Sequence, residues 1–172
     1  VTVIGTVGSD AKKETILANG AAHAVNYKTE NFTEAARDVT GGEGVHVVYD
    51  SVGKDHYQGS MDSLRRRGMM INFGNASGPV PPIDAVELNV KGSLFFTKAS
   101  MRFYQLSRAE LENSAATLFD AIGSGAVKPF IGQTYALADA AQAHIDVWDG
   151  KTTGSTVLSV CGAPSWISNI AR

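Results

Sequence analysis

The sequence predicts an α/β protein in which strands alternate with helices and pair as a parallel sheet. Short apolar runs that are typical of buried strands alternate along the chain with segments of helical periodicity. The clearest run is VHVVYDSVG at residues 45–53, where strand-forming residues are followed by Asp50, Ser51 and Gly53. Open α/β sheets bind ligands beyond the carboxyl ends of their strands. We therefore expect these three residues at the mouth of a binding crevice.

Composition limits the class of protein. The 172 residues are 44% hydrophobic and 19% charged, which is typical of one globular domain. A net charge of −2 argues against general nucleic-acid binding. The one cysteine, Cys161, excludes an intrachain disulfide and a cysteine-based zinc site, and it favours a reducing, cytoplasmic location. No apolar run approaches the ~18 residues of a membrane span, and no signal peptide is recognised.

In the first half of the chain, strand and helix patterns follow one another closely. We expect strands at residues 1–6, 24–26, 45–50 and 69–73, and helices at residues 10–19, 32–39 and 57–67. Ser9 is predicted to cap the first helix and Gly20 to end it. Arg65, Arg66 and Arg67 are assigned to the last turn of the third helix, where cations suit the helix dipole.

The second half is predicted to contain a strand at residues 94–97, a helix at 108–122, an extended segment at 127–135, a helix at 138–148 and a strand at 155–160. Ser107 and Glu110 form a capping box at the start of the long helix. Its apolar residues are expected to form a buried face: Leu111, Ala115, Leu118, Phe119 and Ile122.

Three predicted strands end in turns that contain glycine, at residues 6–9, 50–53 and 72–75. In a doubly wound sheet these turns lie on the same edge, where glycine lets the backbone approach a flat ligand closely. Three such turns, at the spacing of βα units, favour a ligand of nucleotide size. The G-x-G-x-x-G fingerprint that grips a pyrophosphate is absent from the chain.

The turn after the first strand indicates which nucleotide. A site that selects NAD usually places an acid here, but Val7, Gly8 and Ser9 are not acidic. Lys12 and Tyr27 follow, and a cation with a hydroxyl suits a 2′-phosphate. Asp10 is expected to point away from the site. The alternative for Lys12 is an ordinary solvated lysine on a helix.

Other chemistries have weaker support. The four histidines show no metal-ligand spacing. Asp50, Ser51 and His56 could suggest a hydrolase, but Ser51 lacks the G-x-S-x-G elbow. A methyltransferase would need an acid at the end of the first strand, near Val7. A nucleotide or RNA binder without catalysis gains no support from the net charge of −2.

Several longer segments resemble one family of oxidoreductases. VIGTVGSDAKKE, GAAHAVNY, TGGEGVHVVYDSVG, LRRRGMMINFGNASGPV and KGSLFFTKAS resemble the NADPH:quinone oxidoreductases, zinc-free members of the medium-chain dehydrogenase/reductase superfamily related to zeta-crystallin. The resemblance implies that residues 1–160 are part of a Rossmann-type, doubly wound NADPH-binding domain. It also implies that the first strand and an N-terminal barrel-like domain are missing. Residues 161–172 are a tail that departs from the family's ending.

The missing strand has a structural consequence. In the family order the first strand lies at the centre of the sheet, between the strands at residues 1–6 and 45–50. Unless these two strands pair directly, they would flank a gap of roughly 10 Å. We therefore expect another segment or another chain to supply the strand.

The resemblance implies an activity and a cofactor. The intact enzyme would pass hydride from NADPH to a quinone or an α,β-unsaturated carbonyl, without a metal, and as a homodimer paired through residues 94–97. The alternatives are an enoyl or alkenal reductase of the same superfamily and a non-catalytic nucleotide-binding fragment. The family's polar groups near the nicotinamide lie mostly in the missing part. No catalytic residue is therefore assigned, and this chain alone is predicted to be inactive.

The resemblance also implies cofactor contacts, residue by residue. Gly8, Lys12 and Tyr27 match positions around the 2′-phosphate. Ser51 and Val52 match the turn near the ribose and pyrophosphate. The remaining positions match the turn near the nicotinamide and a strand beside it: Phe73, Gly74 and Asn75, then Phe95, Phe96 and Thr97.

Overall fold

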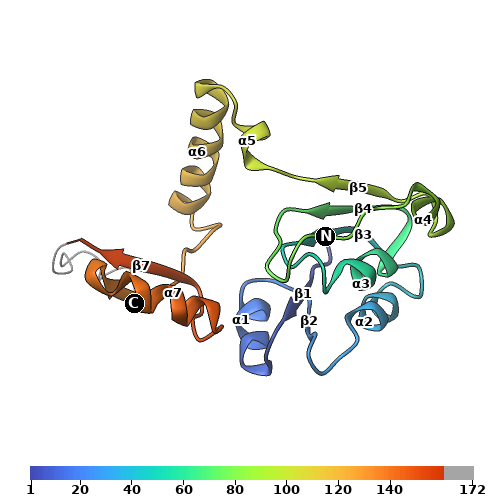
Figure 1. The fold of residues 1–172 in the computed structure, drawn as a ribbon, viewed down its shortest axis with the longest axis horizontal. Helices are drawn as coiled ribbons and strands as arrows, with labels where there is room; N and C mark the ends of the chain where they lie inside the picture. The colour runs from blue at the N-terminus through green and yellow to red at the C-terminus, as the bar shows by residue number, and fades with distance from the viewer. Residues whose placement is uncertain (161–172) are drawn as a thin grey trace. The chain divides into compact units, whose positions relative to one another are not determined.

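The computed structural model describes residues 1–160 and divides the chain into two compact units, Val1–Met101 and the residues from Arg102 onward (Figure 1). The predicted tail at residues 161–172, with Cys161, lies outside the described residues. Within the described part, every helix is too short or too polar to cross a membrane.

The first unit alternates strands and helices, as predicted. Its strands are β1 (Ile4–Val7), β2 (His23–Asn26), β3 (Val45–Asp50), β4 (Leu64–Asn72) and β5 (Phe95–Lys98). Its helices are the 3-10 turn η1 (Asp10–Lys12), α1 (Lys13–Ala18), α2 (Phe32–Val39), α3 (Tyr57–Asp62) and α4 (Ala85–Val90). All strand pairs in this unit are parallel, which confirms the α/β class.

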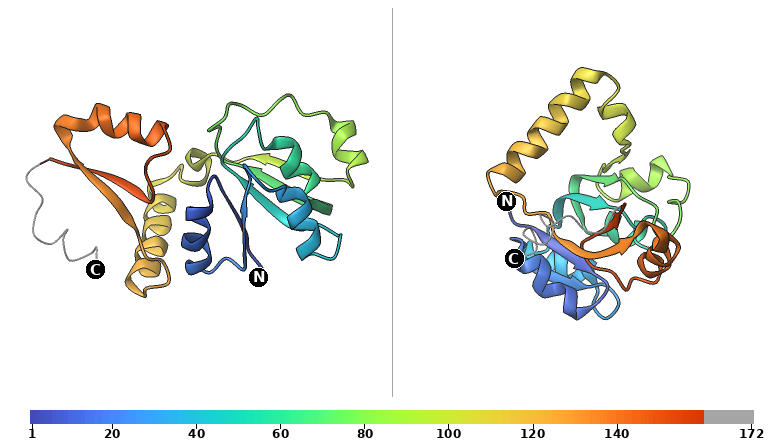
Figure 2. Two further views of the ribbon diagram at one scale, coloured as in Figure 1. Left: turned by 90° about the horizontal axis from the view of Figure 1, so that it is seen from below. Right: turned by 90° about the vertical axis from the view of Figure 1, so that its left-hand side faces the viewer.

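The second unit begins within α5 (Met101–Tyr104) and contains a parallel strand pair. After α6 (Arg108–Gly123) come β6 (Ile131–Ala136), the 3-10 turn η2 (Leu137–Asp139), α7 (Ala140–Trp148) and β7 (Ser155–Ser159). β6 pairs with β7, and α7 connects them (Figure 2). The predicted capping box of α6 is present, because Ser107 and Glu110 each bond the other's backbone N–H.

In the first unit β1 and β3 each pair with a single described strand, so each leaves one edge open. β1 pairs with β2, and β3, β4 and β5 form a separate sheet in that order. In the second sheet Val48 lies beside Met70, and Met70 beside Phe96. Within the described residues β1 and β3 do not pair with each other. Direct pairing across the expected gap is therefore absent.

The core of the first unit lies between α3 and the three-stranded sheet. It is a cluster of five buried residues: Tyr57, Met61, Leu64, Met70 and Leu94. Met61 and Met70 are 1% and 0% exposed, so the middle of β4 is held firmly against α3. This packing fixes the position of the carboxyl ends of the neighbouring strands.

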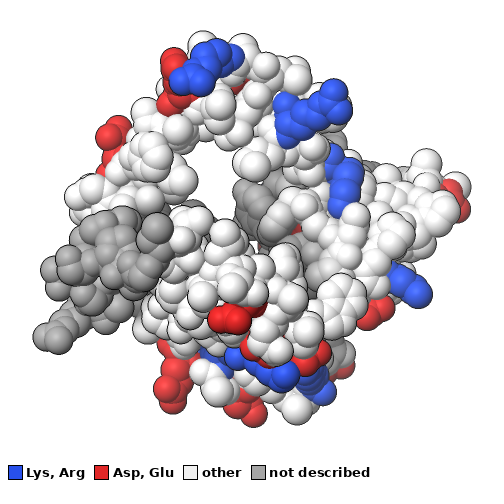
Figure 3. All heavy atoms as spheres, turned by 60° about the vertical axis from the view of Figure 1, so that its left-hand side comes forward, with Lys and Arg blue, Asp and Glu red and all other residues white. Residues whose placement is uncertain are grey.

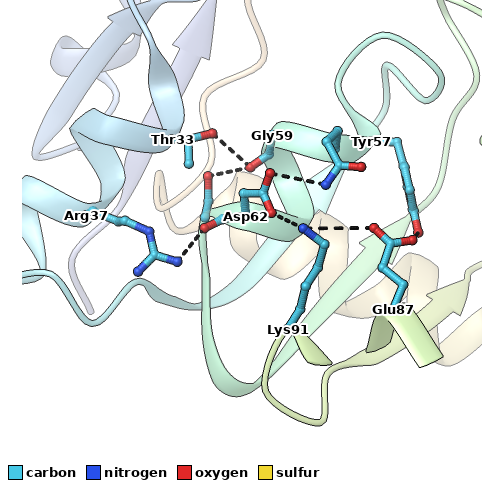
Figure 4. A network of polar contacts seen from close by, with 9 residues as sticks. Thr33, Arg37, Tyr57, Gly59, Asp62, Glu87 and Lys91 are labelled. Carbon is cyan, nitrogen blue, oxygen red and sulfur yellow. Dashed lines mark hydrogen bonds and ion pairs between the residues drawn. The ribbon is translucent and has the colours of Figure 1, made fainter. Parts of the chain in front are cut away.

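A polar network joins α2, α3 and α4 (Figure 4). Lys91, which directly follows α4, forms an ion pair with the Asp62 carboxylate, and Arg37 of α2 donates to the Asp62 carbonyl at 2.7 Å. Tyr57 donates its hydroxyl to Glu87 at 3.1 Å. Burial, assisted by Glu87, raises the pKa of Tyr57 to about 12. The network therefore joins three helices through hydrogen bonds and an ion pair.

The prediction for the three arginines was wrong. Residues 65–67 belong to β4 and not to the end of a helix, since α3 ends at Asp62. Leu64 pairs with Val45 and Met69 with Val47, so the residues between them bulge out of the sheet. Arg67 takes a positive φ of 57° and donates its N–H to the Gly92 carbonyl at 2.8 Å. Pairing with neighbouring strands outweighs the local helix signal here.

Two helix predictions also needed correction. The first helix divides into η1 and α1, and the Ser9 side chain makes no capping hydrogen bond. The apolar face of α6 is not buried in the structure: Leu118 and Phe119 are 51% and 68% exposed. An apolar stripe indicates a helix face that can pack against another apolar surface. It does not show that such a surface is present.

Candidate functional site

Two buried polar residues end adjacent strands of the three-stranded sheet. Asp50 ends β3 and Asn72 ends β4, and they are 4% and 0% exposed. The Asp50 carboxylate accepts hydrogen bonds from the N–H groups of Val52 and Gly53, at 3.0 and 3.1 Å. It also accepts one from the Asn72 side-chain amide, at 2.7 Å. These bonds compensate the burial of the carboxylate and hold the turn after β3 in one conformation.

Lys98 extends this arrangement to the end of β5. Its ammonium donates to the Asn72 side-chain oxygen and, at 2.8 Å, to the side-chain oxygen of Asn75. The carboxyl ends of three parallel strands are therefore joined by one chain of side chains, with Asn75 at its outer end. Asn72 and Lys98 are functional candidates that the sequence analysis missed. The sequence pattern that could have identified them is a polar residue at the last position of each strand.

The turns after β3 and β4 pack directly against each other, as expected for one sheet edge. Ser77 donates its N–H to the Val52 carbonyl at 2.8 Å. A Cβ on Gly74 would clash with the carbonyl oxygen of Ser51, and one on Gly53 with that of Gly78. These two glycines are therefore required where one turn meets the other, whether or not a ligand approaches them.

The predicted cofactor residues of these turns are accessible. Ser51 and Asn75 are exposed, Phe73 is 55% exposed, and Val52 is half-buried. On β5, Phe96 packs toward the core beside Tyr57, with ring centroids 6.4 Å apart. Because side chains alternate along a strand, Phe95 and Thr97 share the opposite face of the sheet. The contacts of these residues with a cofactor stay predictions.

The structure brings two of the three predicted phosphate-site residues together. The Tyr27 hydroxyl lies against Gly8, 2.7 Å from the position that a Cβ would occupy. The Lys28 side chain also reaches this place, with its Cε 3.6 Å from the same position. Lys28 is a further cation that sequence reasoning missed, although it directly follows Tyr27. No described contact joins Lys12 to Gly8 or Tyr27.

The charges around Lys12 leave it available to an anion. Asp10 is held by the Asn26 side-chain amide at 3.1 Å and by Lys13 at 3.4 Å, which lower the pKa of its carboxyl. Lys13 also pairs with Glu30. Among the described residues Lys12 takes part in no ion pair, and its side chain is half-buried. The Asp10 carboxylate thus already has partners, whereas Lys12 has no ion-pair partner among the described residues.

The site contains no cluster suited to a metal. Among residues 1–160, no three or more histidine, cysteine or acidic side chains are grouped so that they could hold an ion. On the face drawn in Figure 3, positive and negative side chains lie near one another over its lower part. That part of the surface therefore carries charges of both signs.

The profile of the zinc-binding dehydrogenase family matches residues 19–158, and the chain belongs to this family. Its curated relatives include a quinone oxidoreductase of Salmonella typhimurium, 46% identical and aligned over 91% of this chain and 48% of the relative. A 2-haloacrylate reductase of a Burkholderia species is also 46% identical, over 91% of this chain and 47% of the relative. The chain spans about half the length of the curated relatives it matches.

Solved structures agree with the sequence relatives. The Escherichia coli quinone oxidoreductase complexed with NADPH aligns with a TM-score of 0.87 at 42% identity, over 91% of this chain and 49% of that one. A 2-haloacrylate reductase aligns with a TM-score of 0.83 at 43% identity, over 93% of this chain and 50% of that one. The predicted resemblance to quinone oxidoreductases and the Rossmann-type fold class are confirmed.

Proposed function

We propose that this chain is the NADPH-binding part of an oxidoreductase that reduces quinones. The observation that carries the proposal is the linked edge of the three-stranded sheet. Asp50, Asn72 and Lys98 hold two turns in place there and leave Ser51 and Asn75 exposed. A structural relative with the same half-chain fold is complexed with NADPH, which supports a dinucleotide at this edge.

The residues of the chain would bind and orient the cofactor. Lys12 and Tyr27 would bind the 2′-phosphate, and Gly8 gives the tyrosine hydroxyl its place. Ser51 and Val52 would contact the ribose and pyrophosphate. Asn75, held by Lys98, would face the nicotinamide end together with Phe73. The bound cofactor supplies the hydride, and the protein aligns it with the substrate and excludes water.

A second candidate is the reduction of an activated carbon–carbon double bond. The relative named 2-haloacrylate reductase is as similar to this chain as the Salmonella quinone oxidoreductase, at 46% identity each. A haloacrylate and a quinone both present a carbon–carbon double bond conjugated to a carbonyl. The alternative substrate class is therefore an α,β-unsaturated acid, ketone or aldehyde.

Three further features belong to the proposal. The edge of β5 that does not pair with β4 would pair with the same edge of a second copy, giving a homodimer. The enzyme would act without zinc. It would work in the cytoplasm, where the NADP pool is kept largely reduced.

Comparison of two cofactors and two substrate classes tests the function. The intact enzyme should oxidise NADPH faster than NADH in the presence of a simple quinone. A 2-haloacrylate and an alkenal serve as competing substrates and decide between the two candidates. The 172-residue chain alone is expected to show no turnover. A rate typical of enzymes, about 1 s⁻¹ or more, from this chain would contradict that expectation.

A further inference from the structure

Three aromatic rings from separate segments meet beside the phosphate site. The rings of Tyr27 and His56 meet edge to face, with centroids 4.6 Å apart and planes at 75°. His56 also contacts Phe32, at 5.3 Å between centroids. Tyr27 directly follows β2, His56 directly precedes α3, and Phe32 begins α2. Only the tertiary fold brings them together.

These contacts restrict a tyrosine that is otherwise accessible. Tyr27 is 36% exposed, and a side chain at that exposure would ordinarily sample several rotamers. Here the hydroxyl end lies against Gly8, where an added Cβ would be 2.7 Å from the oxygen. The ring is bordered by His56. Tyr27 is therefore supported at both its hydroxyl and its ring.

His56 is itself held firmly. Its backbone N–H donates to the Gly53 carbonyl at 3.1 Å, which anchors it to the turn that follows β3. The Phe32 ring, which contacts His56, packs so closely on α3 that a Cβ on Gly59 would be 2.5 Å from it. His56 therefore connects the turn after β3 to the tyrosine at the end of β2.

We infer that His56 is a positioning residue that holds the Tyr27 hydroxyl toward the 2′-phosphate of NADPH and thereby sets the preference for NADPH over NADH. This inference rests on the proposed function. In this proposal His56 acts through its contact with Tyr27 and not by binding the cofactor itself. Nothing in the local sequence marks it for that role, because it lies 29 positions from Tyr27 along the chain.

The test compares His56→Ala, His56→Phe and the control His23→Ala in the intact enzyme. His23 is an exposed histidine at the start of β2, the same strand that leads to Tyr27. Dissociation constants for NADPH and NADH are measured by titration. His56→Ala should weaken NADPH by about three- to tenfold, the scale of one aromatic pair, and leave NADH unchanged. His56→Phe keeps a ring at this place and should restore the preference, and His23→Ala should not alter it.

A second readout needs no cofactor. In the free protein, His56→Ala should change the Hα–Hβ scalar couplings of Tyr27, which report its χ1 rotamer, and His56→Phe and His23→Ala should leave them unchanged. Equal weakening of both cofactors, no rescue by phenylalanine, or unchanged Tyr27 couplings would each overturn the inference. A wild-type enzyme without any NADPH preference would overturn the proposed cofactor instead, and the NMR comparison would still decide whether His56 positions Tyr27.

Discussion

Lys12 and Lys13 are neighbours in sequence with different surroundings. Lys13 is paired with Glu30 and Asp10, and Lys12 is in no ion pair among the described residues. Because an ion pair already engages one lysine, the other is the better candidate for an external phosphate. The distinction cannot be read from the sequence Lys-Lys, since the pairing with Glu30 spans 17 positions.

Replacement of Lys12 should therefore discriminate between cofactors. Lys12→Ala in the intact enzyme is expected to weaken NADPH by roughly 1–3 kcal/mol, the range for a charge-assisted hydrogen bond, and to leave NADH nearly unchanged. Titration calorimetry with both cofactors measures this. Lys128→Ala, which removes an exposed lysine of the second unit, is the control for charge. Equal losses for NADPH and NADH would contradict a 2′-phosphate contact.

Substitution of Asn72 is expected to change the free energy of unfolding. Asn72→Ala removes the 2.7 Å hydrogen bond to the buried Asp50 carboxylate and one acceptor of Lys98. Hydrogen bonds to charged groups contribute about 1.5–3 kcal/mol, so the free energy of unfolding should fall by about that amount. Urea denaturation compares it with Asn89→Ala, an exposed position on α4. Similar midpoints for both variants would show that Asp50 finds another partner.

At the scale of the elements, an ion pair between Lys91 and Asp62 attaches the end of α4 to α3. Burial alone would raise the pKa of Asp62, but hydrogen bonds from Lys91 and Gln58 outweigh it and hold the pKa below the ordinary value of 3.8. The folded state thus favours the ionised carboxylate. Its contribution to stability is present above pH 3.8 and is lost as the pH falls through the lowered value.

Asp62→Asn should reproduce this loss at neutral pH. At pH near 7 the variant is expected to be less stable than the wild type by ~0.2–1 kcal/mol, since the carboxylate is partly exposed. At pH near 3 and below, the difference should shrink, because the wild-type carboxyl is then increasingly protonated. Urea midpoints at both pH values give the answer, with Asp38→Asn as the exposed control on α2. A difference that grows on acidification would refute the assignment.

At the scale of the whole molecule, the unpaired edges of β1 and β3 determine whether the first unit needs a further strand. Each has one described partner strand, and β4 has two. Unpaired backbone groups that are also buried cost about 1–3 kcal/mol each, so several of them rival the ~5–15 kcal/mol that stabilises a domain. We therefore expect the first unit to accept a further strand between β1 and β3.

Hydrogen exchange on the 172-residue chain tests this expectation. Amides of β4, which is bonded on both sides, should exchange more slowly than those of β1 and β3. Protection of β1 and β3 that rises with protein concentration would indicate that a second copy supplies the strand. Equal protection of all three strands at every concentration would mean that the strand order inferred from the resemblance is wrong.

The sequence by itself determined what local chemistry controls. The alternation of strands and helices, the capping box of α6, and Gly20, which follows α1 with a φ of 98°, were all predictable. So were the turns after β3 and β4 and the resemblance to quinone oxidoreductases. These features depend on residues close together in the chain, where propensity, periodicity and turn chemistry act.

Only the tertiary structure decided the features that depend on distant partners. It assigned Arg65–Arg67 to a strand, because β3 pairs with Leu64 and Met69 on either side of them and the Gly92 carbonyl accepts the Arg67 N–H. It joined Asp50, Asn72 and Lys98, and it placed His56 against Tyr27. Each contact joins segments about 20 or more residues apart, and its energy exists only once the fold has brought them together.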